Sequence, residues 1–273
     1  MNTNQTIKSF RDEPHLSYSQ ITLYMNCPLR YRFQYVDQLP ADFTAAALPF
    51  GGAFHETLAH FYRGIKNLNH RYSVDDLIDV FRTDWILRNE SDDTIRFDKG
   101  DTKESLLEKG IAMIKAFHAN VNPGEVIAVE SEFCLRRADN NGSKALPIPI
   151  VGAIDLVERN PEGYIVAVDH KTAARKYADN KVEDDLQLTI YTCALARSKL
   201  VQGDTEYYAR FDVVTKTKNP EFVSYYTSRN DNDHRRLMKL IREVLIGMES
   251  GVFYPISSWM CTNCPYQSHC NNW

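Results

Sequence analysis

The chain has 273 residues, of which 43% are hydrophobic and 25% are charged, proportions that are ordinary for a globular protein. Its formal net charge of −4 excludes a uniformly basic nucleic-acid-binding protein, so any phosphate contact must come from local basic clusters. The polar start MNTNQTIKSFRDEP lacks the apolar core of a signal peptide, and no run of about 18 apolar residues occurs. We therefore expect an intracellular, cytoplasmic protein without a membrane partner.

The first half of the chain carries helical patterns. Ser17 and Gln20 form the signature of a capping box, which predicts the start of a helix. Apolar residues at helical spacing predict a second helix over 52–65, and further helical patterns follow over 74–119. The stripe of the second helix consists of Phe54, Leu58, Phe61 and Ile65.

The hydrophobic period changes to that of strands near residue 126. We expect strands over 126–136, 149–159, 164–172, 206–217 and 222–228, and helices over 184–200 and about 231–249. Neither a repeat nor a linker divides the chain, so this order predicts one α/β domain with a mixed sheet, over 1–273. Its expected parts are a helical part at about 16–120, a sheet core at about 121–230, and a final helix with a cysteine-rich tail at about 231–273.

The segment NPEG at 160–163 predicts a tight hairpin between the second and third strands. Its residue types suit a type I turn followed by a glycine with positive φ. In that register Asp155 lies directly opposite Asp169, and Lys171, two residues further on, shares their face. A one-residue slip would separate the two aspartates. The opposite face would be filled by Ile154, Leu156, Val166 and Val168.

Two carboxylates that face each other in a core are unfavourable unless something compensates their charge. A divalent cation does so, because Mg²⁺ and Mn²⁺ take carboxylate oxygens together with water and phosphate oxygens. Such an ion can polarise a phosphodiester and activate water, and Lys171 could orient that water. The structural alternative is a buried Asp–Lys ion pair, with Asp155 hydrogen-bonded to a turn.

The segments VGAIDLV and VDHKT resemble motifs of the PD-(D/E)xK nuclease superfamily. Within it, the chain most resembles the RecB-like iron–sulfur exonuclease group, which includes the AddB nuclease domain and the CRISPR-adaptation nucleases. The likeness extends over 16–270. It implies a restriction-endonuclease-like α/β fold, with a mixed β-sheet flanked by helices, a helical insertion and a carboxy-terminal iron–sulfur clasp. It also implies that Asp155 and Asp169 bind metal and that Lys171 assists the attacking water.

The resemblance adds four further residues to this site. His55 in GAFHETL matches a metal-binding histidine, and the backbone carbonyl of His170 is implied as another metal ligand. Gln187 and Tyr191 match the QxxxY motif, which touches the active site and the nucleic-acid strand in that family. Their spacing of four puts them on one helical face, although by itself this spacing indicates only a polar helix edge.

Three cysteines crowd the end of the chain as C-x₂-C-x₅-C, at Cys261, Cys264 and Cys270. In an intracellular protein this pattern indicates metal ligands, unless the cysteines are unrelated. The resemblance supplies Cys27 as a fourth ligand and implies a [4Fe–4S] cluster that clasps the two ends; zinc also takes four cysteines. The other two cysteines are expected to be small core residues, namely Cys134 and Cys193.

Basic residues next to these motifs are candidate contacts to nucleic acid. Arginines interleaved with aromatic residues suit a single strand, whose bases stack while its phosphates pair with the cations. The alternative is a helix edge that uses the aromatic residues as core. The candidates are Arg30, Arg32, Arg175 and Lys176, and the aromatic residues are Tyr31, Phe33 and Tyr35.

These patterns predict a Mg²⁺- or Mn²⁺-dependent deoxyribonuclease, in particular an exonuclease that acts on single-stranded DNA or DNA ends. Repair, recombination or CRISPR-adaptation-like processing would be its setting. The chain has no G-x-x-x-x-G-K-[ST] loop, so a helicase or recombination partner would be a separate protein. The alternative is a catalytically silent DNA-binding or scaffold subunit, but such a subunit has no need of Asp155, Asp169 and Lys171.

Overall fold

The computed structural model of the chain describes residues 13–136, 145–201 and 206–273, so most of the segment behind the signal-peptide prediction lies outside it. The helices are α2 (Tyr18–Asn26), α3 (Pro28–Tyr31), the π-helix η1 (Arg32–Val36), α4 (Ala47–Leu68), α5 (Val74–Glu90), α6 (Lys103–Asn120), η2 (Asp179–Val182), α7 (Leu186–Leu195), η3 (Lys199–Val201), α8 (Asp231–Glu249), η4 (Trp259–Asn263) and α9 (Gln267–Asn271). The strands are β1 (Thr44–Ala45), β2 (Ile95–Arg96), β3 (Glu125–Leu135), β4 (Ile150–Arg159), β5 (Ile165–Ala173), β6 (Tyr207–Thr215) and β7 (Phe222–Arg229).

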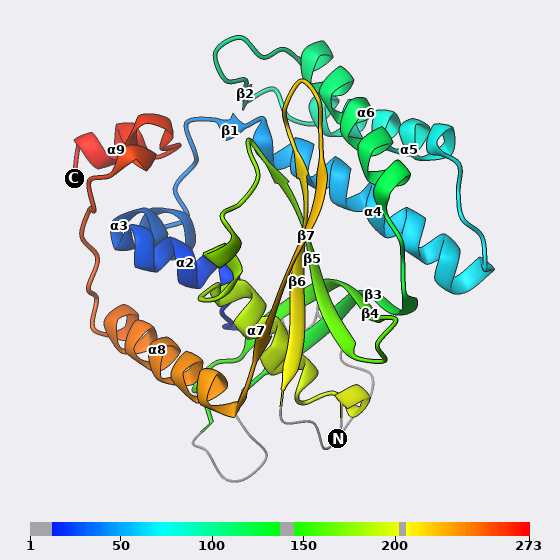
Figure 1. The fold of residues 1–273 in the computed structure, drawn as a ribbon. Coiled ribbons are helices and arrows are strands. Elements are labelled where there is room, and N and C mark those ends of the chain that lie inside the picture. Colours follow the sequence, from blue (N-terminus) through cyan, green and yellow to red (C-terminus); the bar gives the residue numbers. More distant parts are fainter. Residues whose placement is uncertain (1–12, 137–144, 202–205) are drawn as a thin grey trace.

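A five-stranded mixed sheet forms the centre of the molecule, in the order β3-β4-β5-β6-β7. The pair β5–β6 is parallel and the other neighbours are antiparallel, as α7 provides the crossover between β5 and β6. Helices α4, α5 and α6 pack on one face, and α2, α7 and α8 pack on the other (Figure 1). This architecture confirms the expected α/β class with a mixed sheet.

The predicted helices form where the capping and periodicity signals lie. Ser17 accepts a hydrogen bond from the Gln20 main chain, and the Gln20 side chain accepts one from the Ser17 main chain, which is the predicted capping box. Helix α7 is shorter than the expected span 184–200. It ends at Leu195, where the Ser198 hydroxyl donates to the Leu195 carbonyl oxygen and competes with helical continuation.

The hairpin between β4 and β5 has the predicted register over its outer part. Leu156 pairs with Val168 and Arg159 pairs with Ile165, while Gly163 adopts a φ of +91° in the turn. The ladder ends at the pair Leu156–Val168. Asp155 and Asp169 are therefore not paired, contrary to the prediction. The reason is that the Asp155 side chain itself accepts the main-chain N–H of His170, at 2.8 Å.

One part of the predicted face assignment is wrong. Leu156, Val166 and Val168 pack together against α4, α5 and α6, but Ile154 packs in the opposite core with residues of α7 and α8. Strict alternation would put Ile154 and Leu156 on the same face. Asp155 lies between them where the ladders on both sides of β4 lose regular pairing, so the alternation is interrupted there.

The two ends of the described chain pack against each other. Leu29 and Phe33, from the amino-terminal helices, form a small buried cluster with Tyr266 near the carboxy terminus, and three of the cysteines pack around this cluster. Phe33 and Tyr266 have ring centroids 6.3 Å apart. Within the described residues, the helices are all too short or too polar to cross a bilayer.

Candidate active site and cysteine pocket

Asp169, Lys171 and Gln187 form a closed polar triangle between β5 and α7. The Lys171 ammonium lies 2.6 Å from Asp169 Oδ2 and donates to Gln187 Oε1 at 2.7 Å. Gln187 Nε2 donates to Asp169 Oδ1 at 2.5 Å. Asp169 is only 1% exposed, so these two partners replace water around its carboxylate. Asp185 sets the start of α7, because its side chain accepts the N–H groups of Gln187 and Leu188.

Tyr191 extends this triangle by one helical turn. Gln187 Nε2 also lies 3.1 Å from the Tyr191 hydroxyl, as expected for residues four apart on one helix face. Both side chains are buried, and burial raises the pKa of Tyr191 well above its ordinary value. The pattern Gln187–Tyr191 is therefore a buried network that touches Asp169, not an exposed polar helix edge.

Asp155 and His55 form the second polar pair of the site. His55 Nδ1, on α4, lies 3.3 Å from Asp155 Oδ2, on β4. Burial raises the pKa of Asp155, but the hydrogen bond and charge of His55 outweigh it, so that the pKa is lowered overall. Burial lowers the pKa of His55, whereas Asp155 raises it more, so the pKa of the imidazole is above its ordinary value.

Asp169 has the opposite electrostatic character. Burial raises its pKa to about 6; Lys171 opposes this rise and the negative charge of Asp155 adds to it. The charge of Asp155 therefore acts on Asp169 although the two residues are not paired in the ladder. A site that holds two such carboxylates with different pKa values is a candidate for acid–base or metal chemistry.

His170 directs its ring to the opposite face of the sheet. The imidazole stacks on Tyr62, with centroids 5.4 Å apart and an angle of 11°, and both side chains are buried. Burial lowers the pKa of His170 to about 4. Its role in the candidate site therefore belongs to its backbone, whose N–H donates to Asp155.

Glu130 is a further carboxylate at the site, and the sequence analysis missed it. It is half-buried on β3 and has a φ of +51°, which is unusual for a glutamate. Burial raises its pKa to about 6, and the charge of Asp155 acts in the same direction. The sequence signal was the run VESE within an otherwise apolar strand, because it breaks the pattern of a buried strand.

The carboxylates around Asp155 suit a hard divalent cation, because carboxylate oxygens are typical ligands of Mg²⁺ and Mn²⁺; the imidazole nitrogen of His55 is a softer donor, which Mn²⁺ takes more readily than Mg²⁺ does. Within the residues that the structure describes, however, no three His, Cys, Asp or Glu side chains form an assembled metal-binding group. Asp155 is engaged by His55 and by the His170 N–H, and Asp169 is engaged by Lys171 and Gln187. The donor atoms are therefore of the right type for a cation, but a bound cation would have to replace some of these hydrogen bonds.

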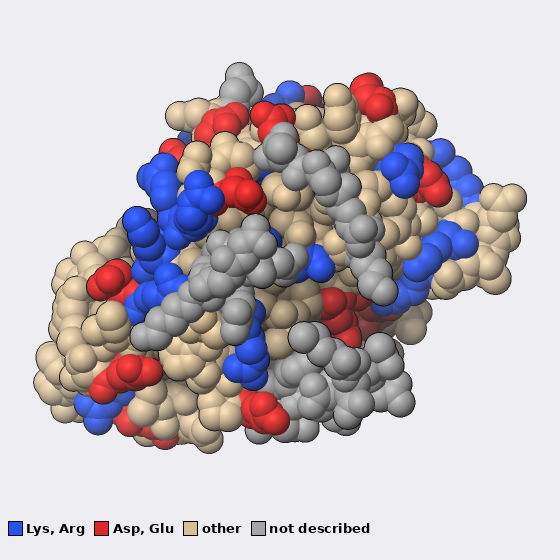
Figure 2. All heavy atoms as spheres, turned by 90° about the horizontal axis from the view of Figure 1, so that it is seen from below, with Lys and Arg blue, Asp and Glu red and all other residues tan. Residues whose placement is uncertain are grey.

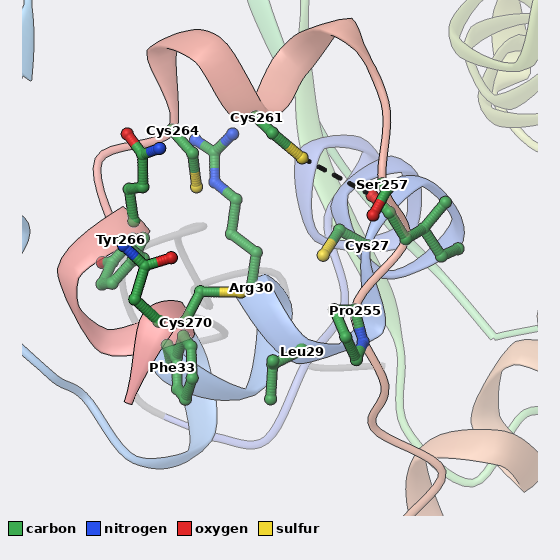
Figure 3. Close-up of a pocket in the computed structure, with 13 residues that line it drawn as sticks. Cys27, Leu29, Arg30, Phe33, Pro255, Ser257, Cys261, Cys264, Tyr266 and Cys270 are labelled. Carbon is green, nitrogen blue, oxygen red and sulfur yellow. Dashed lines mark hydrogen bonds between the residues drawn. The ribbon is translucent and has the colours of Figure 1, made fainter. Parts of the chain in front are cut away.

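The four predicted cluster ligands lie around one pocket of about 230 Å³. Figure 3 shows the side chains of Cys27, Cys261, Cys264 and Cys270 around this pocket, contributed by both ends of the chain. Burial raises the pKa of Cys270, and the neighbouring thiols of the other three add to this effect. The thiol set fits a metal or iron–sulfur centre by chemistry and location, although no three of them form an assembled group in the described structure.

The two cysteines expected in the core differ in burial. Cys193 is fully buried on α7, as predicted, and burial raises the pKa of its thiol to about 11. Cys134 is only half-buried, so its assignment to the core was wrong. It lies near the end of β3, which forms an edge of the sheet and is less covered than the central strands.

Two of the three aromatic residues near Arg30 and Arg32 are buried. Tyr31 packs edge-on against Tyr24 at 5.6 Å, and Phe33 is buried beside Tyr266, so these two rings are not free to stack on bases. Arg30 extends into the cysteine pocket (Figure 3), and Arg32 forms an ion pair with Asp37 at 3.0 Å.

The two later basic candidates lie beyond β5. Arg175 is exposed, and Lys176 is exposed in an ion pair with Glu221 at 2.6 Å. On the face drawn in Figure 2, groups of basic side chains are separated by acidic and uncharged ones. Such a surface favours local contacts over a broad positive binding face.

A buried ionic network supports the sheet behind the site. Arg210 on β6 holds Asp212 through two hydrogen bonds of 2.9 Å and also binds Glu158. The Ser224 hydroxyl donates to Asp212 as well. The charged residues are all at least 95% buried, and the sequence analysis did not single them out because Glu158 and Ser224 reach this group from other strands.

The comparisons with known proteins agree with this fold. A sequence model of the PD-(D/E)XK nuclease superfamily matches residues 15–271. A crystal structure described as a "Putative exonuclease" from Eubacterium rectale has a TM-score of 0.56 at 13% identity, and the match covers 100% of this chain and 93% of that one. At this identity, the likeness concerns the fold alone. A structure described as SSO0001 has a TM-score of 0.37 at 14% identity and covers 83% of this chain and 95% of its own. No curated protein matches the chain.

Proposed function

The chain belongs to the PD-(D/E)XK nuclease superfamily, and we propose that it is a metal-dependent deoxyribonuclease acting as an exonuclease on single-stranded DNA or DNA ends. The observation that carries the proposal is the meeting of Asp155, Asp169 and Lys171 where β4 and β5 stop pairing. A purely structural Asp–Lys pair would account for Asp169 and Lys171, but not for the second buried carboxylate with its histidine partner.

Mg²⁺ or Mn²⁺, when bound, would polarise the phosphodiester and make the attacking water more acidic. Asp155, Asp169, His55 and the carbonyl of His170 are the proposed donors of this ion. The low exposure of the two carboxylates, 1% for Asp169 and 11% for the Asp155 side chain, matters because a carboxylate in a site of low dielectric holds a cation more strongly than one in water.

Lys171 is proposed to orient the water and to balance negative charge that builds on the phosphate. Its ammonium already lies at the carboxylate of Asp169, and this contact raises its pKa although burial acts in the opposite direction. The side chain is therefore a stable cation at neutral pH, suited to electrostatic stabilisation and not to removing a proton.

Gln187 and Tyr191 are proposed to position Lys171 and the strand. Gln187 donates to Asp169 and accepts from Lys171, so it fixes both groups at once. Tyr191 restrains Gln187 from one turn further along α7. Loss of this helix face would leave the contact with Asp169 to hold the lysine in place.

The cysteine pocket supports assignment to the RecB-like iron–sulfur exonuclease group. We propose a [4Fe–4S] cluster on Cys27, Cys261, Cys264 and Cys270, with zinc as the alternative metal. Its role would be to join the amino- and carboxy-terminal segments, which already pack together through Leu29 and Tyr266.

The choice of an exonuclease on DNA rests on the family and on the description of the Eubacterium rectale structure. Arg175 and Lys176, beyond β5, are the proposed phosphate contacts, with Arg30 and Arg32 on the side of the cysteine pocket. A helicase or recombination protein would be a separate partner that supplies the single strand.

A digestion assay tests this function. Purified protein that retains its cysteine-bound metal would be incubated with DNA labelled at the 5′ or the 3′ end, single- or double-stranded, with Mg²⁺, Mn²⁺ or EDTA. We expect release of mono- or short oligonucleotides from one end of single-stranded DNA with either metal, and none with EDTA. Binding of DNA without cleavage under all metal conditions would instead favour the scaffold alternative.

A further inference from the structure

Glu130 lies at an interruption in the ladder between β3 and β4. Val129 pairs with Leu156 and Ser131 pairs with Ile154, whereas Glu130 and Asp155, between these pairs, are not matched. Glu130 thus faces the position of Asp155 across the two strands. The gap in the pairing therefore lies at Asp155, the residue of β4 that is proposed to bind the metal.

The backbone of Glu130 is strained at this point. Its φ of +51° falls in the left-handed region, which is unfavourable for a non-glycine residue. Among the described non-glycine residues only Gln38 and Asn69 share a positive φ, and both lie just beyond helices, where such a conformation is common. Glu130 has it inside a strand, where a regular ladder would avoid it.

Charged side chains of both α4 and β4 lie near Glu130. The charged groups that act on it are Asp155 on β4 and, on α4, His55, Arg63 and Glu56. Arg63 pairs with Glu56 at 2.9 Å and is thereby occupied. In the described part of the chain, no group forms a hydrogen bond with the Glu130 carboxylate, so a half-buried acid remains without a specific partner.

We propose that Glu130 contributes a further carboxylate oxygen to the divalent-cation site of Asp155 and His55; the proposal rests on the function given above. With His55 neutral, as a metal ligand must be, the three carboxylates of Glu130, Asp155 and Asp169 outnumber the ammonium of Lys171. A cation that takes oxygen ligands accounts both for this excess and for the retention of a strained glutamate where an ordinary strand residue would pack better.

Direct binding of Mn²⁺ to the full-length protein without DNA, measured by isothermal titration calorimetry, tests the proposal. The variants are Glu130→Gln, which keeps the size of the side chain, and Glu130→Gly, which relieves the backbone and removes the carboxylate. Asp155→Asn is the reference for loss of the site. Glu132→Gln is the matched control, because Glu132 is exposed on the same strand and pairs regularly with Ala153.

We expect both Glu130 variants to bind Mn²⁺ roughly 10–100-fold more weakly than wild type, and Glu132→Gln to bind like wild type. The rise in melting temperature caused by Mn²⁺ should shrink in parallel. If both Glu130 variants bind like wild type while Asp155→Asn does not, the inference about Glu130 is wrong and the proposed function stands. If the wild-type protein binds neither Mn²⁺ nor Mg²⁺, both proposals are wrong.

Discussion

The carboxylate of Asp155 accepts the main-chain N–H of His170 at 2.8 Å, at the point where β4 and β5 separate. This hydrogen bond joins the two strands by a side chain in place of a backbone pair. It also places Asp155 next to the Asp169–Lys171 stretch of β5, so the same contact ends the ladder and assembles the site.

Asp155→Asn should abolish the proposed nuclease activity but leave the fold intact. Asparagine can still accept the His170 N–H through its amide oxygen, whereas it removes the charge that would hold a cation. We expect metal-dependent DNA digestion to fall by about 100-fold or more and stability to change by about 1 kcal/mol or less. Digestion rates and denaturant unfolding measure the two effects; full activity of the variant would refute the site assignment.

Gln187→Leu and Tyr191→Phe should distinguish the role of Gln187, which contacts Asp169 and Lys171, from that of Tyr191, which contacts Gln187. The leucine variant leaves Lys171 and Asp169 without their common partner, so activity should fall strongly, with a loss of about 1–3 kcal/mol in stability. The phenylalanine variant removes the hydroxyl that contacts Gln187 and Asp169 but leaves Gln187 between Lys171 and Asp169, so it should have a smaller effect on both. Equal loss of activity in the two variants would point to a direct role of the Tyr191 hydroxyl.

Cys261→Ser should lower the content of the cysteine-bound metal, whereas Cys193→Ser should not. Cys261 lines the terminal pocket, and Cys193 is buried on α7 away from it. The Cys193 variant should lose about 1–3 kcal/mol through a buried hydroxyl. Iron and zinc analysis, with the visible spectrum of the purified proteins, distinguishes the two variants. Retention of stoichiometric metal in Cys261→Ser would count against this ligand.

Removal of the bound metal should destabilise the contact between the chain ends. Leu29, Phe33 and Tyr266 pack beside the cysteines, and their small cluster would have to hold the ends together alone. We expect a chelator to lower the melting temperature and to speed proteolysis within 250–273. Unchanged melting and cleavage after verified removal of the metal would show that the metal does not act as a clasp.

Arg210→Met should lower the free energy of unfolding more than the substitution of a surface arginine does. The change leaves Glu158 and Asp212 buried without their shared cation, which costs about 3–5 kcal/mol. Arg235→Met, on the exposed part of α8, is the control. Equilibrium urea unfolding measures both, and a small loss in Arg210→Met would mean that the two carboxylates become protonated or hydrated at low cost.

His234 should make the protein less stable in mild acid. Burial lowers its folded-state pKa to about 4, below the unfolded value of about 6.5, so the unfolded chain binds more protons between these values. Protonation of His234 therefore lowers the free energy of unfolding by roughly 3 kcal/mol as the pH falls from 6.5 towards 4, and the full stability is present above pH 6.5. His234→Phe, which keeps a ring beside Tyr207, should flatten the dependence of unfolding free energy on pH in this range. An unchanged slope would show that His234 does not cause it.

Local signals predicted most of the elements because each signal and its effect lie close together in the chain. The capping box at Ser17, the stripe of α4 and the turn at Gly163 all depend on residues within a few positions of one another. The register of the hairpin followed from its turn for the same reason. Where a side chain replaced a backbone partner, at Asp155, the local rule stopped applying and the face of Ile154 was predicted wrongly.

By itself, the sequence determined the candidate residues, the α/β class and the cysteine spacing, since these are patterns of residue type and order. Only the tertiary structure decided which of them meet. His55 reaches Asp155 because α4 crosses one face of the sheet, while Gln187 reaches Asp169 and Lys171 because α7 packs on the other. The run VESE marked Glu130 as unusual for a buried strand, but its relation to Asp155 depends on an irregular strand pairing that only the tertiary structure shows.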